Sequence, residues 1–388
     1  MRLLWLIDSL TLGGAESLAA TFAIEARRRD VAVTVGVLKT IGGNPIESRL
    51  RDAGIDVVHF GSRNLRDIGA FRRVVAAIRD GEFDVIHSHL TYASIWGALA
   101  SARTGVPHVA TLHTLPLKTG AGAANRARQR LLVSLLTRYA ARVIAVSDAQ
   151  RDAWVNTTSL RPDRTVVVPN GVALPDSNAR AVQNDDTLFL ISAGGERVGV
   201  RGDARGDRTG PTVGTIAALR EGKGLDVLLT AFSAVRKAMP DATLVIAGDG
   251  GLRESLETQA QRLGIAPHWL GYRDDVDTVL AMLDVFVHPT FEDALPTAVL
   301  EAMAMGVAVV ASATGGVPEI VTHEENGLLV PPGDVDALQT AMLRLLHDPD
   351  LRHRLAAAGR RTIEDRFSVD HWIDTLLGVY RDAIGEAV

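Results

Sequence analysis

The stretch from Phe291 to Ala304 reads FEDALPTAVLEAMA and carries two carboxylates, Asp293 and Glu301, eight residues apart. Pro296 predicts the first turn of a helix, because the N–H group that proline lacks would have no partner there. Glu301 follows about one and a half turns later, among apolar residues where an unpaired carboxylate is costly. A helix N-terminus favours an anion, so two acceptors beside it suit a sugar nucleotide, with hydroxyls at both ends and phosphates between. The alternative is an N-cap acid and a glutamate in an internal salt bridge.

Outward from this stretch, short runs rich in β-branched residues alternate with helical patterns. The predicted strands of a first series are Leu3–Ile7, Val31–Leu38, Asp56–Phe60, Asp84–His87, Val109–Leu112, Val143–Val146 and Val166–Val168. Those of a second series are Thr212–Ala217, Leu244–Ala247, Val285–His288 and Val307–Ala311. Such alternation predicts an α/β fold with two parallel-sheet, Rossmann-like domains. Small ligands commonly bind in the cleft between such domains, at the carboxyl ends of the strands.

Composition marks the domain boundary. Pro175 to Asp186 is polar and predicts a linker, whereas Ser192–Pro211 is rich in Gly, Arg and Asp and predicts a surface loop or an inert insertion. From Val335 onward the pattern is helical almost throughout. The predicted parts are residues 1–174, residues 187–366 and a last helix in residues 367–388.

Composition and charge exclude several classes of protein. With 388 residues and 47% hydrophobic content, the chain can bury a large core. Its 41 basic and 46 acidic residues give no support for a general nucleic-acid binder. The absence of cysteine excludes disulfides, thiolate metal sites and a cysteine nucleophile. The apolar run at the start is interrupted by Asp8, and no uncharged run reaches the length of a membrane span, so we expect a cytoplasmic protein, at most peripheral to a membrane.

Two glycine-containing loops are candidates for binding phosphate. Gly13 and Gly14 follow the first strand and precede a helix, where the backbone can approach an anion closely. Arg220 and Lys223 lie in a loop between the first strand and first helix of the second domain, and together they suit a diphosphate. The alternatives are an ordinary tight turn and two solvated basic residues beside Glu221.

Three histidines lie at neighbouring strand ends. His113 ends a strand of the first domain, where an imidazole can act as acid, base or hydrogen-bond donor. His87 and His89 lie at another strand end. A metal site is disfavoured, because no carboxylate lies beside these histidines at ligand spacing. A structural role is the alternative for a single histidine.

The segment from Asn125 to Arg142 predicts an amphipathic helix. The arginines are expected on one side of it and the leucines on the other. These residues are Arg126, Arg128, Arg130, Arg138 and Arg142, and Leu131, Leu132, Leu135 and Leu136. Such a helix suits an anionic membrane surface. The alternative is a surface helix whose leucines lie in the core and whose arginines are solvated or paired.

In combination, these motifs closely resemble family 4 glycosyltransferases over nearly the whole chain. The shared segments are the Gly-Gly loop after the first strand, VIHSH, TLHT, VIAVS, VVPNGV, KGLDVLL, LVIAGDGGLRESL, LGYRDDV, the run from Asp284 to Val330, and NGLLVPPGD. The resemblance implies the GT-B fold, with two Rossmann-like domains facing each other across a cleft. It also implies a retaining hexosyltransferase of polysaccharide biosynthesis that uses a UDP- or GDP-sugar as a substrate, with no cofactor and no metal ion. The first domain would bind the acceptor and the second the donor, and the last helix would cross back to the first domain.

The resemblance also implies roles for single residues. Glu301 would hold the ribose hydroxyls, and Asp293 would contact the donor sugar together with the backbone N–H groups of Ala294 and Leu295. Lys223 would bind the diphosphate, with Gly14 beside it. Tyr272 and Arg273 fall where the nucleobase is usually held. His113 would lie near the transferred sugar and the acceptor, which is expected to be a glycan or lipid-linked.

Two departures from the family pattern affect these roles. Asp293 replaces the first glutamate of the family's E-x7-E motif, so its side chain is one methylene shorter. The family's phosphate-binding arginine lies five residues before the lysine, a position that Ala218 occupies here, and Arg220 would have to substitute for it. A sugar-nucleotide epimerase with the same fold, or a catalytically silent GT-B scaffold, would be the competing functions.

Overall fold

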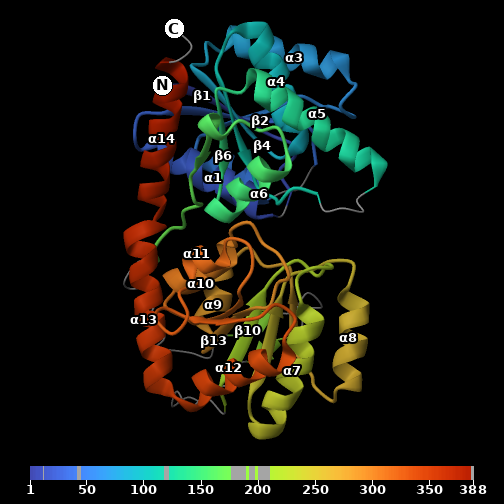
Figure 1. Ribbon diagram of the computed structural model, residues 1–388, viewed down its shortest axis with the longest axis vertical. Coiled ribbons are helices and arrows are strands. Elements are labelled where there is room, and N and C mark those ends of the chain that lie inside the picture. The colour runs from blue at the N-terminus through green and yellow to red at the C-terminus, as the bar shows by residue number, and fades with distance from the viewer. Residues whose placement is uncertain are drawn as a thin grey trace. The chain divides into compact units, whose positions relative to one another are not determined.

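The computed structural model describes residues 1–11, 13–41, 45–117, 122–175, 189–191, 197–199 and 210–385 (Figure 1). The chain divides into two compact units. The first unit consists of Met1–Gly171 together with Val369–Val388, and the second consists of Val172–Ser368. Each unit is a parallel α/β structure, which confirms the predicted fold class.

The sheet of the first unit has seven strands within the described residues, in the order β3-β2-β1-β4-β5-β6-β7. They are β1 (Arg2–Ile7), β2 (Ala32–Val37), β3 (Asp56–His59), β4 (Val85–His89), β5 (His108–Leu112), β6 (Arg142–Ala145) and β7 (Thr165–Val167). All neighbouring pairs are parallel. The order reverses between β1 and β4, and such switch points are where ligands bind in open parallel sheets.

Helices cover both faces of this sheet. The helices are α1 (Gly14–Arg27), α2 (Pro45–Asp52), α3 (Ile68–Asp80), α4 (Thr91–Thr104), α5 (Ala123–Tyr139), α6 (Asp148–Thr157), the 3-10 turn η1 (Pro162–Arg164) and α14 (Val369–Gly385). Side chains alternate along β1, so that Leu3 and Trp5 pack with α1, α2 and α14, whereas Leu4 packs with α3, α4 and α5. Helix α14 therefore belongs to the core of the first unit, although the whole second unit precedes it in the chain.

The sheet of the second unit has six strands within the described residues, in the order β12-β11-β10-β13-β14-β15. They are β10 (Thr212–Ile216), β11 (Thr243–Ala247), β12 (His268–Gly271), β13 (Val285–His288), β14 (Ala308–Ser312) and β15 (Leu328–Val330). The helices are α7 (Leu225–Ala238), α8 (Arg253–Arg262), α9 (Val276–Ala281), α10 (Thr297–Ala304), α11 (Val317–Ile320), α12 (Val335–His347) and α13 (Pro349–Arg366). Here the strand order reverses between β10 and β13.

The strands predicted from the sequence are all confirmed, but four strands within the described residues were missed and three local predictions were wrong. Two of the missed strands, β12 and β15, belong to the six-stranded sheet, and the other two pair with each other outside both sheets. Pro296 is the N-cap of α10 and lies just before the helix, with an extended ψ of 113°. Helix α5 ends at Tyr139, because Ala140 turns into extended backbone and Arg142 begins β6, so Arg142 is not part of the helical cluster. Leu131 is 47% exposed, whereas Leu132 and Leu136 lie in the core.

The predicted linker and loop fall largely outside the described residues. Residues 176–186 of the linker and most of Ser192–Pro211 are in this region. Residues 189–191 and 197–199 are described, and they form β8 (Phe189–Ile191) and β9 (Arg197–Gly199), which pair antiparallel. Because β9 lies inside Ser192–Pro211, the segment predicted as a loop contains a strand. Of the helices in the described ranges, none combines the length and apolar character needed to cross a bilayer.

Candidate functional site

The two loops predicted to bind the donor meet at the switch point of the second sheet. Lys223 lies in the loop after β10, and Asp293 lies in the loop after the neighbouring strand β13. Lys223 Nζ donates a hydrogen bond to Asp293 Oδ2 at 2.6 Å, and both side chains are largely buried. The structure therefore brings together a cation and a carboxylate that the sequence places 70 residues apart.

Backbone contacts hold these loops in place. The Gly222 carbonyl accepts hydrogen bonds from the Phe291 N–H at 2.8 Å and from the Thr290 hydroxyl at 3.0 Å. Gly315 has a φ of +53°, and a Cβ atom there would lie 1.8 Å from the Asp293 carbonyl oxygen. Only glycine allows this close approach, so the loop after β14 supports the backbone that carries Asp293.

Asp293 is ionised at neutral pH. Burial alone would raise its pKa, but the proximity of His288 and of Lys223 outweighs burial and lowers the pKa of the carboxyl well below its usual range. His288 Nε2 lies 3.4 Å from Asp293 Oδ2. Because Lys223 neutralises Asp293, the carboxylate can face a bound diphosphate without strong repulsion.

Glu301 has a different environment. It lies on α10, which follows β13, and within the described residues its carboxylate has no hydrogen-bond or ion-pair partner. Burial raises the pKa of Glu301 to about 7, and the nearby charge of Asp277 adds to this effect. The predicted alternative, an internal salt bridge, is therefore absent from the described part of the chain. A partly buried carboxylate without a donor is suited to accept hydrogen bonds from a ligand.

Four further predicted residues lie in loops at the same edge of this sheet. Arg220 is exposed and has no ion-pair partner within the described ranges. Tyr272 follows β12 and is 41% exposed, whereas the guanidinium of Arg273 is held by Asp275. In the described structure the backbone N–H of Leu295 has no acceptor, as expected for a group that is offered to a ligand.

Ala294, the last of the donor-site residues predicted in this unit, is buried at 4% exposure next to Leu295. It follows Asp293 directly, so its backbone lies in the loop that Gly315 and Gly222 support. The backbone of this loop is therefore fixed before any ligand binds.

In the first unit, the Gly13-Gly14 segment lies after β1 at that sheet's own switch point. Gly13 is the N-cap of α1, and its carbonyl accepts a hydrogen bond from the Ser17 N–H at 3.0 Å. A Cβ atom on Gly13 would lie 2.5 Å from Oε2 of Glu16, which is buried and accepts a hydrogen bond from the Thr11 hydroxyl. A side chain at position 13 would therefore displace the Glu16 carboxylate from its place beside the start of α1.

His113 is paired with His89 at the ends of β5 and β4. His89 Nδ1 lies 2.7 Å from His113 Nε2, and His89 stacks on Trp5 with ring centroids 3.9 Å apart. Burial lowers the pKa of His113 to about 4 and the pKa of His89 well below its usual value, so both rings are neutral at pH 7. A neutral His113 acts as a hydrogen-bonding group, because an imidazole with this pKa is a weak base and is not an acid at pH 7.

The hydrogen bond between these rings assigns their protons. His89 Nε2 is buried and has no hydrogen-bond partner in the part of the chain that the structure describes, and an N–H without an acceptor there would cost more than an unused lone pair. The proton of His89 is therefore placed on Nδ1, where it donates to His113 Nε2. Because His113 Nε2 accepts this bond, the proton of His113 lies on Nδ1. His113 also lines a cavity of about 290 Å³.

Sequence reasoning named two polar residues that support these sites, His87 and Asp8, but missed the groups to which they bond. His87 bonds to the hydroxyls of Tyr380 at 2.6 Å and Thr111 at 2.7 Å, so it has a structural role. Asp8 accepts hydrogen bonds from the N–H groups of Tyr92 and Ala93 in the first turn of α4. A carboxylate directly after an apolar strand was the sequence signal that could have indicated this structural role. Within the described ranges, no group of three His, Cys, Asp or Glu residues is placed to hold a metal ion.

Two family models match the two halves of the chain. The model described as Glycosyltransferase Family 4 matches residues 12–174. The model described as Glycosyl transferases group 1 matches residues 202–362, which include the Lys223–Asp293 pair and Glu301.

Similar proteins agree with these matches. Alpha-maltose-1-phosphate synthase of Mycolicibacterium smegmatis is 31% identical over 320 residues, which cover 76% of this chain and 78% of that protein. D-inositol 3-phosphate glycosyltransferase of Saccharomonospora viridis is 28% identical over an alignment that covers 96% of this chain and 90% of that protein. The crystal structure of Anabaena Alr3699/HepE in complex with UDP-glucose has a TM-score of 0.81, with 24% identity and coverage of 98% and 99% of the two chains. The solved structure shows that the fold is that of GT-B glycosyltransferases.

Proposed function

The chain belongs to glycosyltransferase family 4, and we propose that it moves a hexose from a UDP- or GDP-sugar to an acceptor with retention of anomeric configuration. The observation that carries this proposal is the arrangement around the second switch point. A neutralised carboxylate, Asp293, and a carboxylate that has no partner among the described residues, Glu301, lie on consecutive parts of the loop and helix after β13. Together they offer acceptors for hydroxyl groups on the two sides of a diphosphate.

Each part of a sugar nucleotide has a counterpart in this arrangement. Glu301 accepts hydrogen bonds from the ribose hydroxyls, and the nucleobase lies near Tyr272 and Arg273. Lys223 keeps its hydrogen bond to Asp293 and directs its remaining N–H groups to the diphosphate, since an ammonium group has three donors. Asp293 and the N–H groups of Ala294 and Leu295 hold the sugar. The Anabaena structure with UDP-glucose supports a uridine donor as the first to be tested.

The transfer step depends on charge stabilisation. The bond between the anomeric carbon and the diphosphate oxygen breaks, and its electron pair leaves with the diphosphate. The acceptor oxygen forms the new bond on the same face, and its proton passes to the departing diphosphate oxygen. Lys223, Arg220 and the N-terminus of α10 supply the positive charge that stabilises the leaving group, so we propose that no metal ion is needed. His113 donates from Nδ1 to the transferred sugar.

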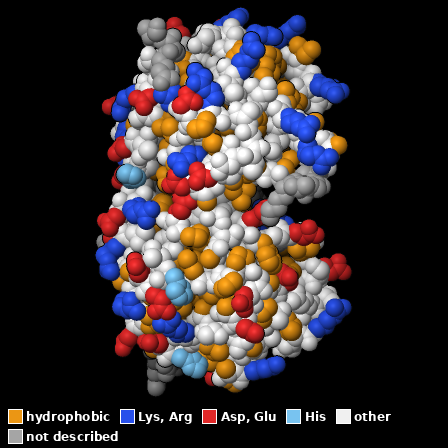
Figure 2. All heavy atoms as spheres, viewed as in Figure 1, with side chains coloured by type: hydrophobic (Ala, Val, Ile, Leu, Met, Phe, Trp, Pro, Cys, Tyr) orange, Lys and Arg blue, Asp and Glu red, His pale blue; other side chains and the backbone are white. Residues whose placement is uncertain are grey.

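We propose a glycan or lipid-linked acceptor that binds the first unit, and peripheral contact of that unit with an anionic membrane at the cytoplasmic face. Basic side chains gather along the edge of the first unit where α5 lies (Figure 2). Three of the arginines lie in the first half of α5, and Arg142 is excluded from this group by its place on β6. Each basic residue near a charged membrane contributes about 1 kcal/mol of binding free energy.

A thermal-shift screen of the whole chain tests the proposal. The ligands are UDP, GDP and their glucose and mannose conjugates, each with and without EDTA. Stabilisation by one nucleotide and its sugar conjugates, unaffected by EDTA, is expected. Failure to bind any of them would favour a silent scaffold, and turnover of the sugar nucleotide without an acceptor would favour an epimerase.

A further inference from the structure

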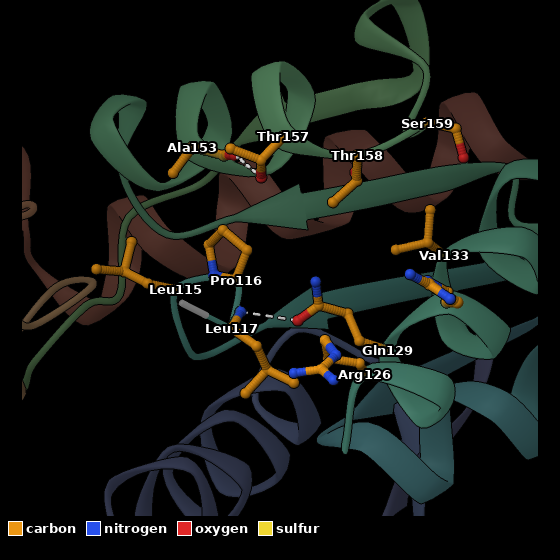
Figure 3. Close-up of a pocket in the computed structure, with 11 residues that line it drawn as sticks. Leu115, Pro116, Leu117, Arg126, Gln129, Val133, Ala153, Thr157, Thr158 and Ser159 are labelled. Atoms are coloured by element: carbon orange, nitrogen blue, oxygen red, sulfur yellow. Dashed lines mark hydrogen bonds between the residues drawn. The ribbon is translucent and has the colours of Figure 1, made fainter. Parts of the chain in front are cut away.

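The first unit contains a large cavity between α5 and α6, apart from the switch point of its sheet. Its volume is about 920 Å³. The segment after β5 contributes Leu115 and Leu117, α5 contributes Arg126 and Arg130, and α6 contributes Ala153 (Figure 3). Gln129, which also lies on α5, holds the segment after β5 in place, because its side-chain oxygen accepts a hydrogen bond from the Leu117 N–H at 2.8 Å.

The charge of α5 is not explained by helix stability. The helix begins with AANRARQR and carries no acidic residue along its length. Positive charge near a helix N-terminus opposes the macrodipole and is unfavourable for helix stability. Arg128 is engaged over the ring of Tyr92, at 5.2 Å from its centroid. Arg126 and Arg130 lie one turn apart and both border the cavity, so they provide neighbouring positive charges that suit a phosphate or diphosphate.

The walls of the cavity indicate that an anion alone is not the ligand. Leu115, Pro116, Leu117 and Val133 form an apolar part of its lining, next to a polar part formed by Gln129, Thr157, Thr158 and Ser159, and Leu117 is 43% exposed. The nearby Leu131, also on α5, is 47% exposed. A cavity of this volume with apolar walls and a basic rim is complementary to a hydrocarbon chain that carries phosphate at one end.

A second cavity lies beside the large one. It has a volume of about 290 Å³, is lined by His113, and shares Leu115, Leu117 and Gln129 with the large cavity. A ligand in the large cavity therefore binds next to the part of the first unit that contains His113.

We propose that the cavity between α5 and α6 binds the phosphate and the first part of the hydrocarbon chain of a prenyl diphosphate-linked acceptor. The inference rests on the proposed transferase function and names the class of acceptor. The phosphate lies between Arg126 and Arg130, and the hydrocarbon chain lies along Leu117 and Val133.

Calorimetry with the whole chain tests this inference. The probes are geranyl diphosphate, a short and soluble compound of that class, inorganic pyrophosphate and uncharged geraniol. Geranyl diphosphate should bind at least about tenfold more tightly than pyrophosphate or geraniol, because only it satisfies both the arginines and the apolar walls. Changing both Arg126→Gln and Arg130→Gln should weaken its binding at least about tenfold, as expected for loss of hydrogen bonds to a charged group.

Two variants serve as comparisons. Arg138→Gln removes the same charge from the same helix but does not border the cavity, so it should leave geranyl diphosphate binding unchanged. Leu117→Ser should weaken geranyl diphosphate and leave pyrophosphate unaffected. Equal losses in the Arg138 and double-arginine variants, or equal affinity for pyrophosphate and geranyl diphosphate, would overturn the inference.

The donor is titrated in parallel so that the two proposals can fail separately. UDP-glucose and GDP-mannose should bind all of these variants as they bind the parent protein, because the donor residues lie in the second unit. Binding of a donor with no binding of geranyl diphosphate overturns the acceptor inference alone. Failure to bind either donor overturns the proposed function itself.

Discussion

Lys223 Nζ lies 2.6 Å from Asp293 Oδ2, and this bond joins the loops after the two strands between which the strand order of the second sheet reverses. The pair therefore marks the point in the sheet where a ligand is expected, and it exists without one. Because an ammonium group has two further donors, the pair can stay intact while Lys223 contacts a phosphate.

Lys223→Ala should weaken UDP binding by about 1.5–3 kcal/mol, the range for a hydrogen bond to a charged group. The measurement is calorimetry with and without EDTA, which should give the same affinity. Lys237→Ala is a matched control, because Lys237 is exposed in the last turn of α7 and carries the same charge. A strict requirement for a divalent cation would contradict the proposed metal-free step.

Asp293→Asn and Glu301→Gln should separate the two ends of the donor. Glu301→Gln should weaken both UDP and UDP-glucose, because both contain the ribose. Asp293→Asn should leave UDP affinity unchanged or higher, since it removes a negative charge near the diphosphate, while UDP-glucose affinity and turnover fall. Equal losses for both ligands in the Asp293 variant would show that its assigned contact with the sugar is wrong.

The affinity for UDP-glucose should rise with pH between about pH 6 and pH 8. The pKa of Glu301 is about 7 in the ligand-free protein, and the ionised carboxylate accepts the ribose hydroxyls best. Binding should therefore release a proton in this range. UDP-glucose is the appropriate ligand, because its diphosphate has no group that titrates there. Glu301→Gln should give a flat profile, and a persistent slope in that variant would assign the titration to another group.

The same residue should make the stability of the ligand-free protein depend on pH. The pKa of Glu301 in the folded state lies above its unfolded value, so the folded state binds more protons and the free energy of unfolding falls as pH rises from about 4.5 to 7. At pH 8, Glu301→Gln should be more stable than the parent by on the order of 2 kcal/mol. Urea unfolding at pH 5 and pH 8 measures this, and the difference between the proteins should shrink at pH 5.

His89→Leu should lower turnover about tenfold or more without changing the affinity for UDP. His89 holds the proton of His113 on Nδ1, and loss of that bond leaves His113 Nε2 without its donor. Nitrogen-15 NMR of the imidazoles should show a mixed His113 tautomer in the variant. His89→Asn, which retains a donor near the same place, should recover part of the turnover. Unchanged turnover in His89→Leu would remove His89 from the proposed mechanism.

The sequence predicted strand positions well and contacts between loops poorly. Val285, Phe286 and Val287 form a continuous apolar run, and burial on both faces requires such a run whatever lies beside it. Strand β12 has the same length but reads HWLG, and it was missed because it has no run of β-branched or apolar residues of that kind. The prediction that Glu301 lies among apolar residues needed only helical periodicity, and the structure confirms it.

The Lys223–Asp293 bond could not be predicted by the same reasoning. It depends on strand order, which places β13 beside β10, and local patterns carry no information about that order. The pairing of His89 with His113 depends likewise on β4 and β5 being neighbours with His89 opposite Thr111. Residue types at strand ends therefore identified candidates, and the tertiary structure decided which of them meet.

The hydrogen bond between His87 and Tyr380 has a consequence for biosynthesis. Tyr380 lies on α14, so the polar centre of the first unit and the aromatic contacts of Phe22 with Trp372 are completed by residues translated after the whole second unit. Domains generally fold as units while the ribosome is still at work. The second unit, Val172–Ser368, is therefore completely synthesised and able to fold before the first unit. The first unit is translated earlier, but it cannot complete its core until α14 has been synthesised. Until then α1 packs on the sheet, but the side of Phe22 that contacts Trp372 and Tyr380 stays exposed, so this apolar surface of the nascent chain is open to non-native contacts.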